Sequence, residues 1–462
     1  MRIYLTSEGH DTAIPIHRIS PEDMDSWLAG LSPAQARWVR DNHFTGDKGQ
    51  SLTLADQKGA LAAVAIGLGS DPMSDGQELW CLAPLARNLP DGTYRLIGAD
   101  SPKLMALGWA LAQYKFDRYQ KKKNSRAAKL FVAEADGMNE LAALISGITL
   151  VRDLVNIPTC DMGPSHLSAA LKDLADRHGG EFTETLGDDL LVKGYNAIHT
   201  VGRAAEDLPR LLDMRWGRKD APLVTLVGKG VCFDTGGLDV KPSSGMRIMK
   251  KDMGGAAHAL GLAQIIMETG LDLRLRLLIP AVENNISGNA FRPGDIIKTY
   301  HGTTVEVDNT DAEGRLILCD ALALASEEDP DLLLDFATLT GAARVAMGGE
   351  IVPFFTDGDD LAQNLALASA AEQDPIWRMP LYAPYAPELK SSCADLSNLG
   401  KGPYGGAIMA ALFLKHFVKK PAQWVHFDVF AWNLKDQPGR PCGGEAMALR
   451  AVYAYLKNSF GK

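Results

Sequence analysis

Acidic and basic side chains crowd into one short run of the chain, Asn309-Thr310-Asp311-Ala312-Glu313-Gly314-Arg315-Leu316. An alternating apolar run, residues 304–308, precedes it, and a helical pattern follows it, which predicts a strand leading in and a helix leading out. Charged side chains in such a turn lie at the end of a sheet strand, where open α/β sheets bind their ligands. A solvated acidic turn with an incidental arginine is the alternative interpretation.

A second charged series lies upstream. The unbroken β-prone run 223–228 predicts a buried strand that ends just before Lys229 and Asp234, and Asp252 opens another predicted helix. Strand ends could therefore bring four acids together: Asp234, Asp252, Asp311 and Glu313. Four buried like charges cannot coexist unpaired. Two divalent cations would cancel their formal charge, so a dinuclear metal centre is the simplest electrostatic solution.

On these residues the chain resembles the leucyl aminopeptidases, the two-metal M17 peptidase family. The signature N-T-D-A-E-G-R-L lies at 309–316, a block like G-K-G-x-x-F-D-[ST]-G-G-x-x-x-K-P at 228–242, and a block like M-K-x-D-M-G-G-A-A at 249–257. The three blocks occur in the family's order. The resemblance is strong from about Val151 to the C-terminus and weak before it.

The resemblance implies a ligand set for two divalent ions, zinc or manganese. Asp234 and Glu313 would bridge both ions, Asp311 would complete one site, and Asp252 with the amine of Lys229 would complete the other. A lysine amine normally keeps its proton up to a pKa of about 10.4. A dication at bonding distance can supply the necessary shift. The alternative for Lys229 is a solvated lysine at a strand end.

The resemblance also implies a catalytic pair. Lys241 would keep its distance from the acids, stay protonated and polarise the scissile carbonyl or stabilise the oxyanion. Arg315 would hold a bicarbonate ion that acts as the general base toward the metal-bound water. The chain has no H-E-x-x-H arrangement, and His258 is predicted to be a packed helix residue. The alternative for Lys241 is a charge-balancing partner of Asp239 or another acid.

The substrate implied by the family is a peptide with a free N-terminus, because the α-amino group binds a metal and restricts hydrolysis to the first residue. Four positions match those that line the pocket for that residue's side chain: Met249, Asn309, Thr338 and Gly341. Adaptable methionine and small glycine suit a medium apolar residue such as leucine, with broad tolerance. Ordinary core packing is the alternative for these four. The family also suggests a homohexamer with its catalytic domains inward.

Composition is that of a globular protein with a large core, at 462 residues, 46% hydrophobic and 23% charged. The net charge of −10 makes nucleic acid an improbable main partner. No apolar run reaches the roughly 18 residues of a membrane span, and the start lacks a signal-peptide core. We therefore expect a cytoplasmic protein. Six scattered cysteines without a C-x-x-C pair predict buried thiols and no disulfide framework.

The first part of the chain, residues 1–134, is predicted to be a separate α/β domain. Strands are expected at 61–67 and 93–97, and helices at 33–42 and 103–116. A basic run at 118–126 is predicted to be a solvated surface or interdomain segment, with nucleic-acid contact as the alternative.

Residues 135–462 are predicted to form the catalytic domain, opening with a linking helix at 136–156. Strands are expected at 223–228, 273–280, 303–308, 332–337 and 424–430, alternating with helices at 256–267, 315–326, 406–418 and 446–456. Such alternation predicts a mostly parallel α/β sheet sandwiched by helices. The long connection 382–406, rich in Pro and Gly, is predicted to shape the pocket rim.

Two other functions remain open from the residues alone. Another dinuclear hydrolase, such as a phosphoesterase, would use the same metals. A binding or regulatory protein could contact DNA through its N-terminal domain. A P-loop and a G-x-S-x-G elbow are both missing from the sequence, which argues against nucleotide binding and serine hydrolysis.

Overall fold

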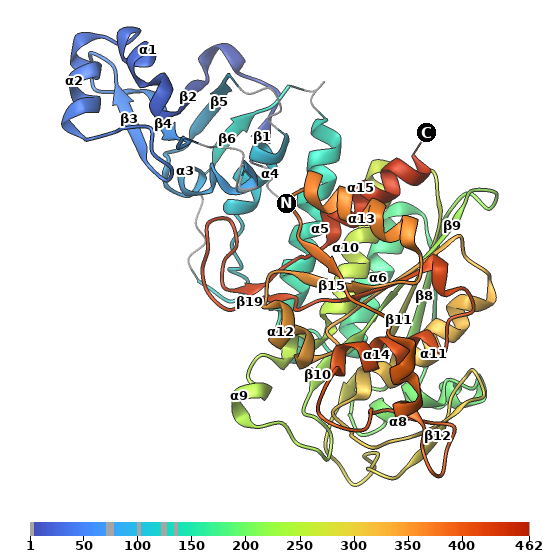
Figure 1. The fold of residues 1–462 in the computed structure, drawn as a ribbon. Coiled ribbons are helices and arrows are strands. Elements are labelled where there is room, and N and C mark those ends of the chain that lie inside the picture. Colours follow the sequence, from blue (N-terminus) through green and yellow to red (C-terminus); the bar gives the residue numbers. More distant parts are fainter. Residues whose placement is uncertain (1–3, 71–77, 99–102, 122–126, 134–136, 462) are drawn as a thin grey trace. The chain divides into compact units, whose positions relative to one another are not determined.

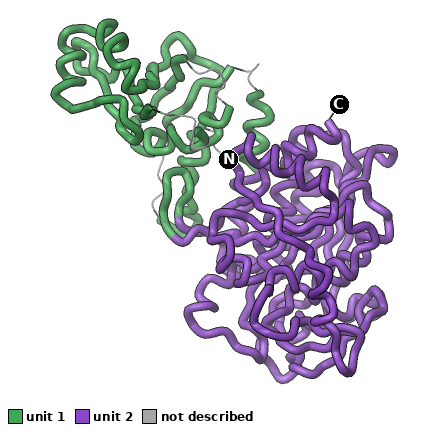
Figure 2. The backbone as a smooth tube through the Cα atoms, in the orientation of Figure 1, with its two compact units in different colours: residues 1–146, 435–441 green, residues 147–434, 442–462 purple. Residues whose placement is uncertain are grey.

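A computed structural model describes residues 4–70, 78–98, 103–121, 127–133 and 137–461 (Figure 1). The chain divides into two compact units (Figure 2): unit 1 holds residues 1–146 and 435–441, and unit 2 holds residues 147–434 and 442–462. Helix α5, Met138–Asn156, crosses from one unit to the other. The predicted boundary at residues 134 and 135 lies outside the described residues and stays a prediction.

Unit 1 contains a six-stranded sheet in which five strands are parallel and β3 runs antiparallel along one edge. Its strands, in the order β1-β6-β5-β2-β4-β3, are β1 Leu5–Thr6, β6 Ala128–Phe131, β5 Gly92–Ile97, β2 Ile14–Ile19, β4 Leu61–Gly67 and β3 Ser51–Ala55. Its helices are α1 Met24–Ala29, α2 Pro33–Asp41, α3 Ala83–Asn88 and α4 Lys103–Ala112. The four elements predicted here are thus present, with α4 ending earlier than expected.

Unit 2 is organised around a nine-stranded sheet. The order is β16-β15-β18-β14-β9-β11-β8-β7, and β10 pairs with β11. Strands β18, β14, β9, β11 and β10 are mutually parallel, whereas β7 and β8 at one side and β15 beside β18 join antiparallel. The bounds are β7 Glu181–Leu186, β8 Arg210–Gly217, β9 Leu223–Gly228, β10 Gly230–Asp234, β11 Arg274–Asn284, β14 Leu332–Ala337, β15 Val352–Phe355, β16 Ile376–Arg378 and β18 Trp424–Asp428.

Helices cover both faces of this sheet, as predicted (Figure 1). Helices α8, α11 and α14 share one apolar core with strand residues, and α10 packs on β9 and β14 from the other side, with α6 and α15 against it. The bounds are α6 Pro164–His178, α7 Asp189–Val192, α8 Asn196–Gly202, α9 Ser243–Met246, α10 Gly254–Thr269, α11 Glu313–Glu327, α12 Gly341–Met347, α13 Asp359–Ala371, α14 Gly406–Lys415 and α15 Leu449–Phe460.

Glycine allows the start of α10 to approach the sheet closely. A Cβ atom at Gly255 would lie 2.1 Å from the carbonyl oxygen of Phe336 in β14. Since no real contact is that short, only glycine fits. This close approach sets the position of Asp252, which lies in the 3₁₀ helix η6, Met249–Met253, immediately before α10.

One predicted strand belongs to a different sheet. The run 303–308 was expected to join the main sheet, but β13, Thr304–Glu306, lies in a separate three-stranded sheet between β12, Ile296–Lys298, and β17, Leu396–Ser397. The alternation of polar and apolar residues in this run suits a half-exposed strand, whereas the central strand β14 is buried throughout. A two-stranded sheet, β19 Trp432–Asn433 with β20 Gly443–Gly444, completes the unit.

The expectation of buried cysteines is wrong for half of them. Cys160, Cys393 and Cys442 are exposed, whereas Cys232 and Cys319 are buried, and none of the six forms a disulfide in the described structure. Apolar neighbours in the sequence did not predict burial, because Cys160 and Cys393 lie in short turns and connections outside the core elements. Within the described residues, no helix combines the length and apolarity needed to cross a membrane.

Candidate metal centre

The carboxyl ends of the parallel strands meet at one edge of the main sheet. Strand β9 ends at Gly228, directly before Lys229, and β10 ends at Asp234. Strand β14, which pairs with β9, is followed by Thr338. The sheet itself therefore places these three side chains at the same edge.

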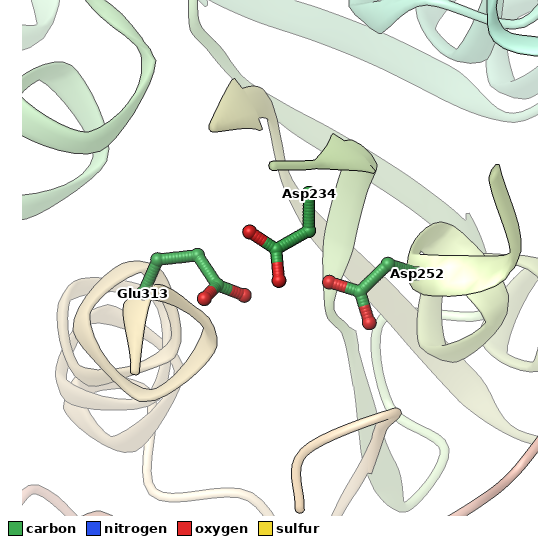
Figure 3. A group of neighbouring side chains, drawn as sticks. All are labelled: Asp234, Asp252 and Glu313. Atoms are coloured by element: carbon green, nitrogen blue, oxygen red, sulfur yellow. The ribbon is translucent and has the colours of Figure 1, made fainter. Parts of the chain in front are cut away.

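Three carboxylates converge there. One oxygen from each of Asp234, Asp252 and Glu313 lies within 4.8 Å of the others, and all three side chains are buried. Figure 3 shows them pointing toward one another, Asp252 from η6 and Glu313 from the first turn of α11. Asp311 lies outside this group of three, and its side chain is 33% exposed.

Lys229 is buried among these acids. Its Nζ lies 2.9 Å from Oδ2 of Asp252 and 2.9 Å from Oε1 of Glu313, and it donates a hydrogen bond to the carbonyl oxygen of Thr338 at 2.9 Å. A Cβ atom at Gly314 would lie 2.5 Å from Cε of Lys229. Helix α11 can therefore meet this side chain only because residue 314 is glycine.

Lys241 does not keep the predicted distance from the acids. Its Nζ lies 2.8 Å from Oδ2 of Asp234 and also contacts Asp311. The physical reason is electrostatic, since carboxylates that share a buried site attract the nearest flexible cation. The charge-balancing alternative thus describes its contacts, although its partners are Asp234 and Asp311 and not Asp239.

The electrostatics of the cluster are unbalanced. Burial, followed by repulsion from Glu313 and Asp252, raises the pKa of Asp234 well above its ordinary value. Burial also raises the pKa of Glu313. Burial acts in the same sense on Asp252, but the ammonium groups of Lys229 and Lys251 outweigh it and lower the pKa of Asp252 overall. The positive charge near Asp234 and Glu313 is therefore too small to stabilise both as carboxylates.

The residues fit a pair of divalent cations. Among the described residues, the four carboxylates form ion pairs with only two ammonium groups, those of Lys229 and Lys241, while Lys251 acts on Asp252 at longer range. In the described part of the chain, Oδ2 of Asp252 and Oε1 of Glu313 accept no hydrogen bond, although each has Lys229 as an ion-pair neighbour. Buried oxygen donors of this kind suit hard divalent ions. Lys229 could join the ligands only after losing a proton. The neighbouring acids favour its protonated form, because they raise the pKa of Lys229 against the effect of burial.

Arg315 lies in the first turn of α11 and is buried. Its Nη1 donates to the carbonyl oxygen of Asn398 at 2.7 Å, while its Nε has no partner among the described residues. Burial lowers the pKa of Arg315 to about 10, so the guanidinium still carries its charge at neutral pH. A buried cation with an unused N–H group is suited to bind an anion.

Two of the predicted pocket residues hold the acids. The hydroxyl group of Thr338 donates to Oδ1 of Asp252 at 2.7 Å, and Oδ1 of Asn309 accepts from the backbone N–H of Asp311 at 2.7 Å. Met249 is half-buried at the start of η6. Gly341 is exposed, and nothing lies within 4 Å of a Cβ atom placed there. Of the four, Gly341 thus borders open space.

His258 is a packed residue of α10, as predicted. Its side chain is fully buried. Its Nε2 accepts from the backbone N–H of Met447 at 2.9 Å, and its Nδ1 lies 2.6 Å from the carbonyl oxygen of Gly254. Both ring nitrogens therefore contact backbone groups and not the acids.

Sequence reasoning missed the amides that hold the metal loops. Nδ2 of Asn284 donates to Oδ1 of Asp234 at 2.8 Å and to the carbonyl oxygen of Thr310 at 3.1 Å. Because β11 ends at Asn284, its place at a strand end was a usable signal. Asn398 contacts the loop before α11 from the connection between α13 and α14, where the sequence has no periodic pattern.

Comparisons with known proteins agree with this geometry. Residues 149–453 match the family described as "Cytosol aminopeptidase family, catalytic domain", and residues 14–133 match the one described as "M17 aminopeptidase, N-terminal domain". Together the two matches cover most of the chain.

Individual relatives extend over nearly the full length. Peptidase B of Pectobacterium carotovorum is 39% identical over 420 residues, which cover 88% of this chain and 92% of the relative. A probable cytosol aminopeptidase of Geotalea uraniireducens is 33% identical over 466 residues, covering 94% and 93%.

Solved structures share the fold. A cytosol aminopeptidase from Coxiella burnetii has a TM-score of 0.94 at 46% identity and covers 99% of both chains. The bottromycin maturation enzyme BotP, solved in complex with Mn, has a TM-score of 0.86 at 32% identity, covering 96% of this chain and 99% of BotP.

Proposed function

Because the chain belongs to the cytosol aminopeptidase family and is thus an M17 metallo-exopeptidase, we propose that it releases the N-terminal residue, preferably leucine or another apolar residue, from peptides with a free N-terminus. The observation that carries the proposal is the convergence of Asp234, Asp252 and Glu313 around Lys229 at the carboxyl edge of the sheet. Peptide hydrolysis is the chemistry that such a site can run.

The proposed ligands are those that the family resemblance implies. Asp234 and Glu313 would be shared by two ions, Asp311 would complete one site, and Asp252 with Lys229 would complete the other. Zinc or manganese, when bound, would acidify a water molecule and polarise the scissile carbonyl. Manganese has support from the relative BotP, which was solved with Mn. The approach of one oxygen from each of Asp234, Asp252 and Glu313 to within 4.8 Å of the others supports these three as ligands.

Lys241 and Arg315 are the proposed catalytic pair. Asp234 and its neighbours raise the pKa of Lys241 against the effect of burial, so Lys241 stays an ammonium group that can donate to the carbonyl oxygen of the substrate and to the oxyanion that develops from it. Arg315 would hold bicarbonate through its unused Nε, and bicarbonate held there would supply a general base. Both cations thus act by position and charge.

The side chain of the first substrate residue would lie against Met249, Asn309, Thr338 and Gly341. The open space beside Gly341 and the flexible Met249 favour an apolar side chain of medium size. Thr338 and Asn309 would act there while also holding Asp252 and Asp311. Pocket and metal centre would therefore share residues.

Location and assembly are proposed from the relatives. Proteins named cytosol aminopeptidase favour the cytoplasm, and family resemblance favours a homohexamer. Mass photometry of the purified protein measures the assembly directly, and a single species at the mass of six chains is the expected result.

A pair of substrates tests the activity. Metal-depleted protein supplied with Mn²⁺ or Zn²⁺ should release p-nitroaniline from leucine p-nitroanilide but not from its N-acetyl form, because the free α-amino group is part of binding. Equal rates on both substrates would contradict the proposal. Nitrophenyl phosphate in the same assay tests the phosphoesterase alternative, and turnover of it in place of the anilide would favour that class.

A matched pair of variants tests the site. Glu313→Gln removes a shared charge at the start of α11 and should lower Mn²⁺ affinity and turnover together. Glu327→Gln makes the same change at the other end of α11, where the carboxylate accepts a hydrogen bond from the hydroxyl group of Tyr300 and from no other described residue, and should change neither. Normal metal affinity in Glu313→Gln would exclude this residue as a ligand.

A further inference from the structure

The loop from Asp308 to Ala312 is held by hydrogen bonds to residues elsewhere in the chain. It connects β13 to α11 and carries Asp311 just before Glu313. Within the loop, Ala312 N–H bonds the carbonyl oxygen of Asn309, and Asp311 N–H bonds the side chain of Asn309. Other backbone groups of the loop are left for a partner elsewhere in the chain.

Asn398 is one such partner, beside Asn284 and Asp239, which bond the backbone of Thr310. Its Oδ1 accepts from the backbone N–H groups of Asp308 at 2.8 Å and Asn309 at 3.2 Å. Its Nδ2 donates to the carbonyl oxygens of Asn309 at 2.7 Å and Ala312 at 3.3 Å. A side-chain amide offers two donors and two acceptor positions, so the whole capacity of this amide is spent on the loop.

The backbone of Asn398 binds the same strip of chain on either side of the loop. Its N–H donates to the carbonyl oxygen of Glu306 at 2.9 Å, and its carbonyl oxygen accepts from Arg315 at 2.7 Å. The residue is fully buried. One residue thus fixes the end of β13, the loop with Asp311 and the guanidinium of Arg315 relative to one another.

We infer that Asn398 is a positioning residue for the metal centre: its amide sets the loop that presents Asp311 and Glu313 to the ions. This inference rests on the proposed function. None of the hydrogen bonds described for Asn398 goes to a carboxylate of the site, so it acts through the loop and is not itself a ligand. Asp234 and Asp252 come from other segments of the chain. A shift of the loop would therefore move Asp311 and Glu313 relative to these two acids and distort the geometry of the metal ligands.

Two substitutions separate this role from ordinary packing. Asn398→Asp keeps the shape and the Oδ1 acceptor but removes both side-chain donors, and Asn398→Ala removes the amide entirely. Partners that orient metal ligands typically change metal affinity ten- to a hundredfold when lost. We expect a Mn²⁺ dissociation constant raised by about that factor in both variants.

A control on the same connection isolates the loop. Ser391 bonds the carboxylate of Glu306 in β13 and the backbone of its own turn, and it makes no hydrogen bond to the loop 308–312 in the described structure. Ser391→Ala should therefore lower the melting temperature of the metal-free protein without changing its Mn²⁺ affinity.

Mn²⁺ affinity is measured by competition with a chelating dye, alongside the melting temperature in excess chelator and the kinetics at rising Mn²⁺. A positioning role predicts weaker Mn²⁺ binding, a nearly unchanged KM, and a kcat that excess Mn²⁺ restores, which a folding defect would not show. If Asn398→Ala fails to fold, the near-isosteric Asn398→Asp carries the test. Parental Mn²⁺ affinity in the folded Asn398 variants, or a kcat that excess metal leaves low, would overturn the inference. A parent protein that binds no Mn²⁺ would instead overturn the proposed function.

Discussion

A single methyl group at position 314 should disable the metal centre and leave the fold in place. In Gly314→Ala the new Cβ would lie 2.5 Å from Cε, 2.7 Å from Nζ and 2.8 Å from Cδ of Lys229. The lysine cannot easily retreat, because its Nζ is held by Asp252, Glu313 and the carbonyl oxygen of Thr338. The substitution thus displaces the side chain that ties the cluster together.

The expected magnitudes follow from competing effects. Alanine in place of glycine within a helix stabilises it by roughly 0.5–1 kcal/mol, whereas overpacking costs about 1–3 kcal/mol. The net loss in free energy of unfolding is therefore about 0–2.5 kcal/mol, smaller than a typical stability of about 5–15 kcal/mol. To reach an ordinary 3.4 Å contact, Cε must move by about 0.9 Å. Displacements near 1 Å in a catalytic site cost about a hundredfold in rate.

The assay combines Mn²⁺ titration, hydrolysis of leucine p-nitroanilide and thermal unfolding in chelator. We expect Gly314→Ala to bind Mn²⁺ at least tenfold more weakly and to lose about two orders of magnitude in kcat, with its metal-free unfolding nearly unchanged. Gly341→Ala is the matched control, because a Cβ atom there meets open space, and it should keep the parent's Mn²⁺ affinity. If Gly314→Ala binds Mn²⁺ as tightly as the parent, Lys229 is not part of the site.

Three further variants test separate parts of the structure. Burial lowers the pKa of His258 to about 4, below its unfolded value of about 6.5. The contribution of the neutral ring to the free energy of unfolding is therefore full above pH 6.5 and should fall by about 2 kcal/mol between pH 7 and pH 5. Chemical denaturation at both pH values should show a smaller fall in the free energy of unfolding for His258→Gln, and equal falls in the two proteins would contradict the assignment. Thr338→Val removes the hydroxyl donor to Asp252. In the dye competition it should bind Mn²⁺ about tenfold more weakly, whereas an unchanged affinity would show that other contacts hold Asp252. Arg315→Met should lower kcat by a factor of about 10²–10⁴ and keep the Mn²⁺ affinity. In CO₂-free buffer we expect added bicarbonate to accelerate the parent but not this variant. A variant that still responds to bicarbonate would refute the assigned role.

The sequence alone predicted the sandwiched, mostly parallel sheet and most of the elements that carry the site, but it missed strand β10, which ends at Asp234. This was possible because helix and strand periodicity are read from windows of a few residues, and the apolar runs of β9 and β14 are unambiguous. The alternating run before Asp308 was read correctly as a strand but assigned to the wrong sheet. Periodicity shows that a strand is half-exposed, and it does not show which strand is its neighbour.

Residue types and family resemblance also selected the acids, although only Asp234 ends a strand of the main sheet, while Asp252 lies in η6 and Glu313 in α11. Only the tertiary structure decided which cation pairs with which acid, and it placed Lys241 against Asp234 and Asp311 where the sequence suggested separation. It alone revealed Asn398, which bonds Arg315 across 83 positions of the chain. Local sequence encodes backbone propensity, whereas the pairing of buried charges and amides depends on the groups that surround each atom in space, and those groups come from remote segments that folding brings together.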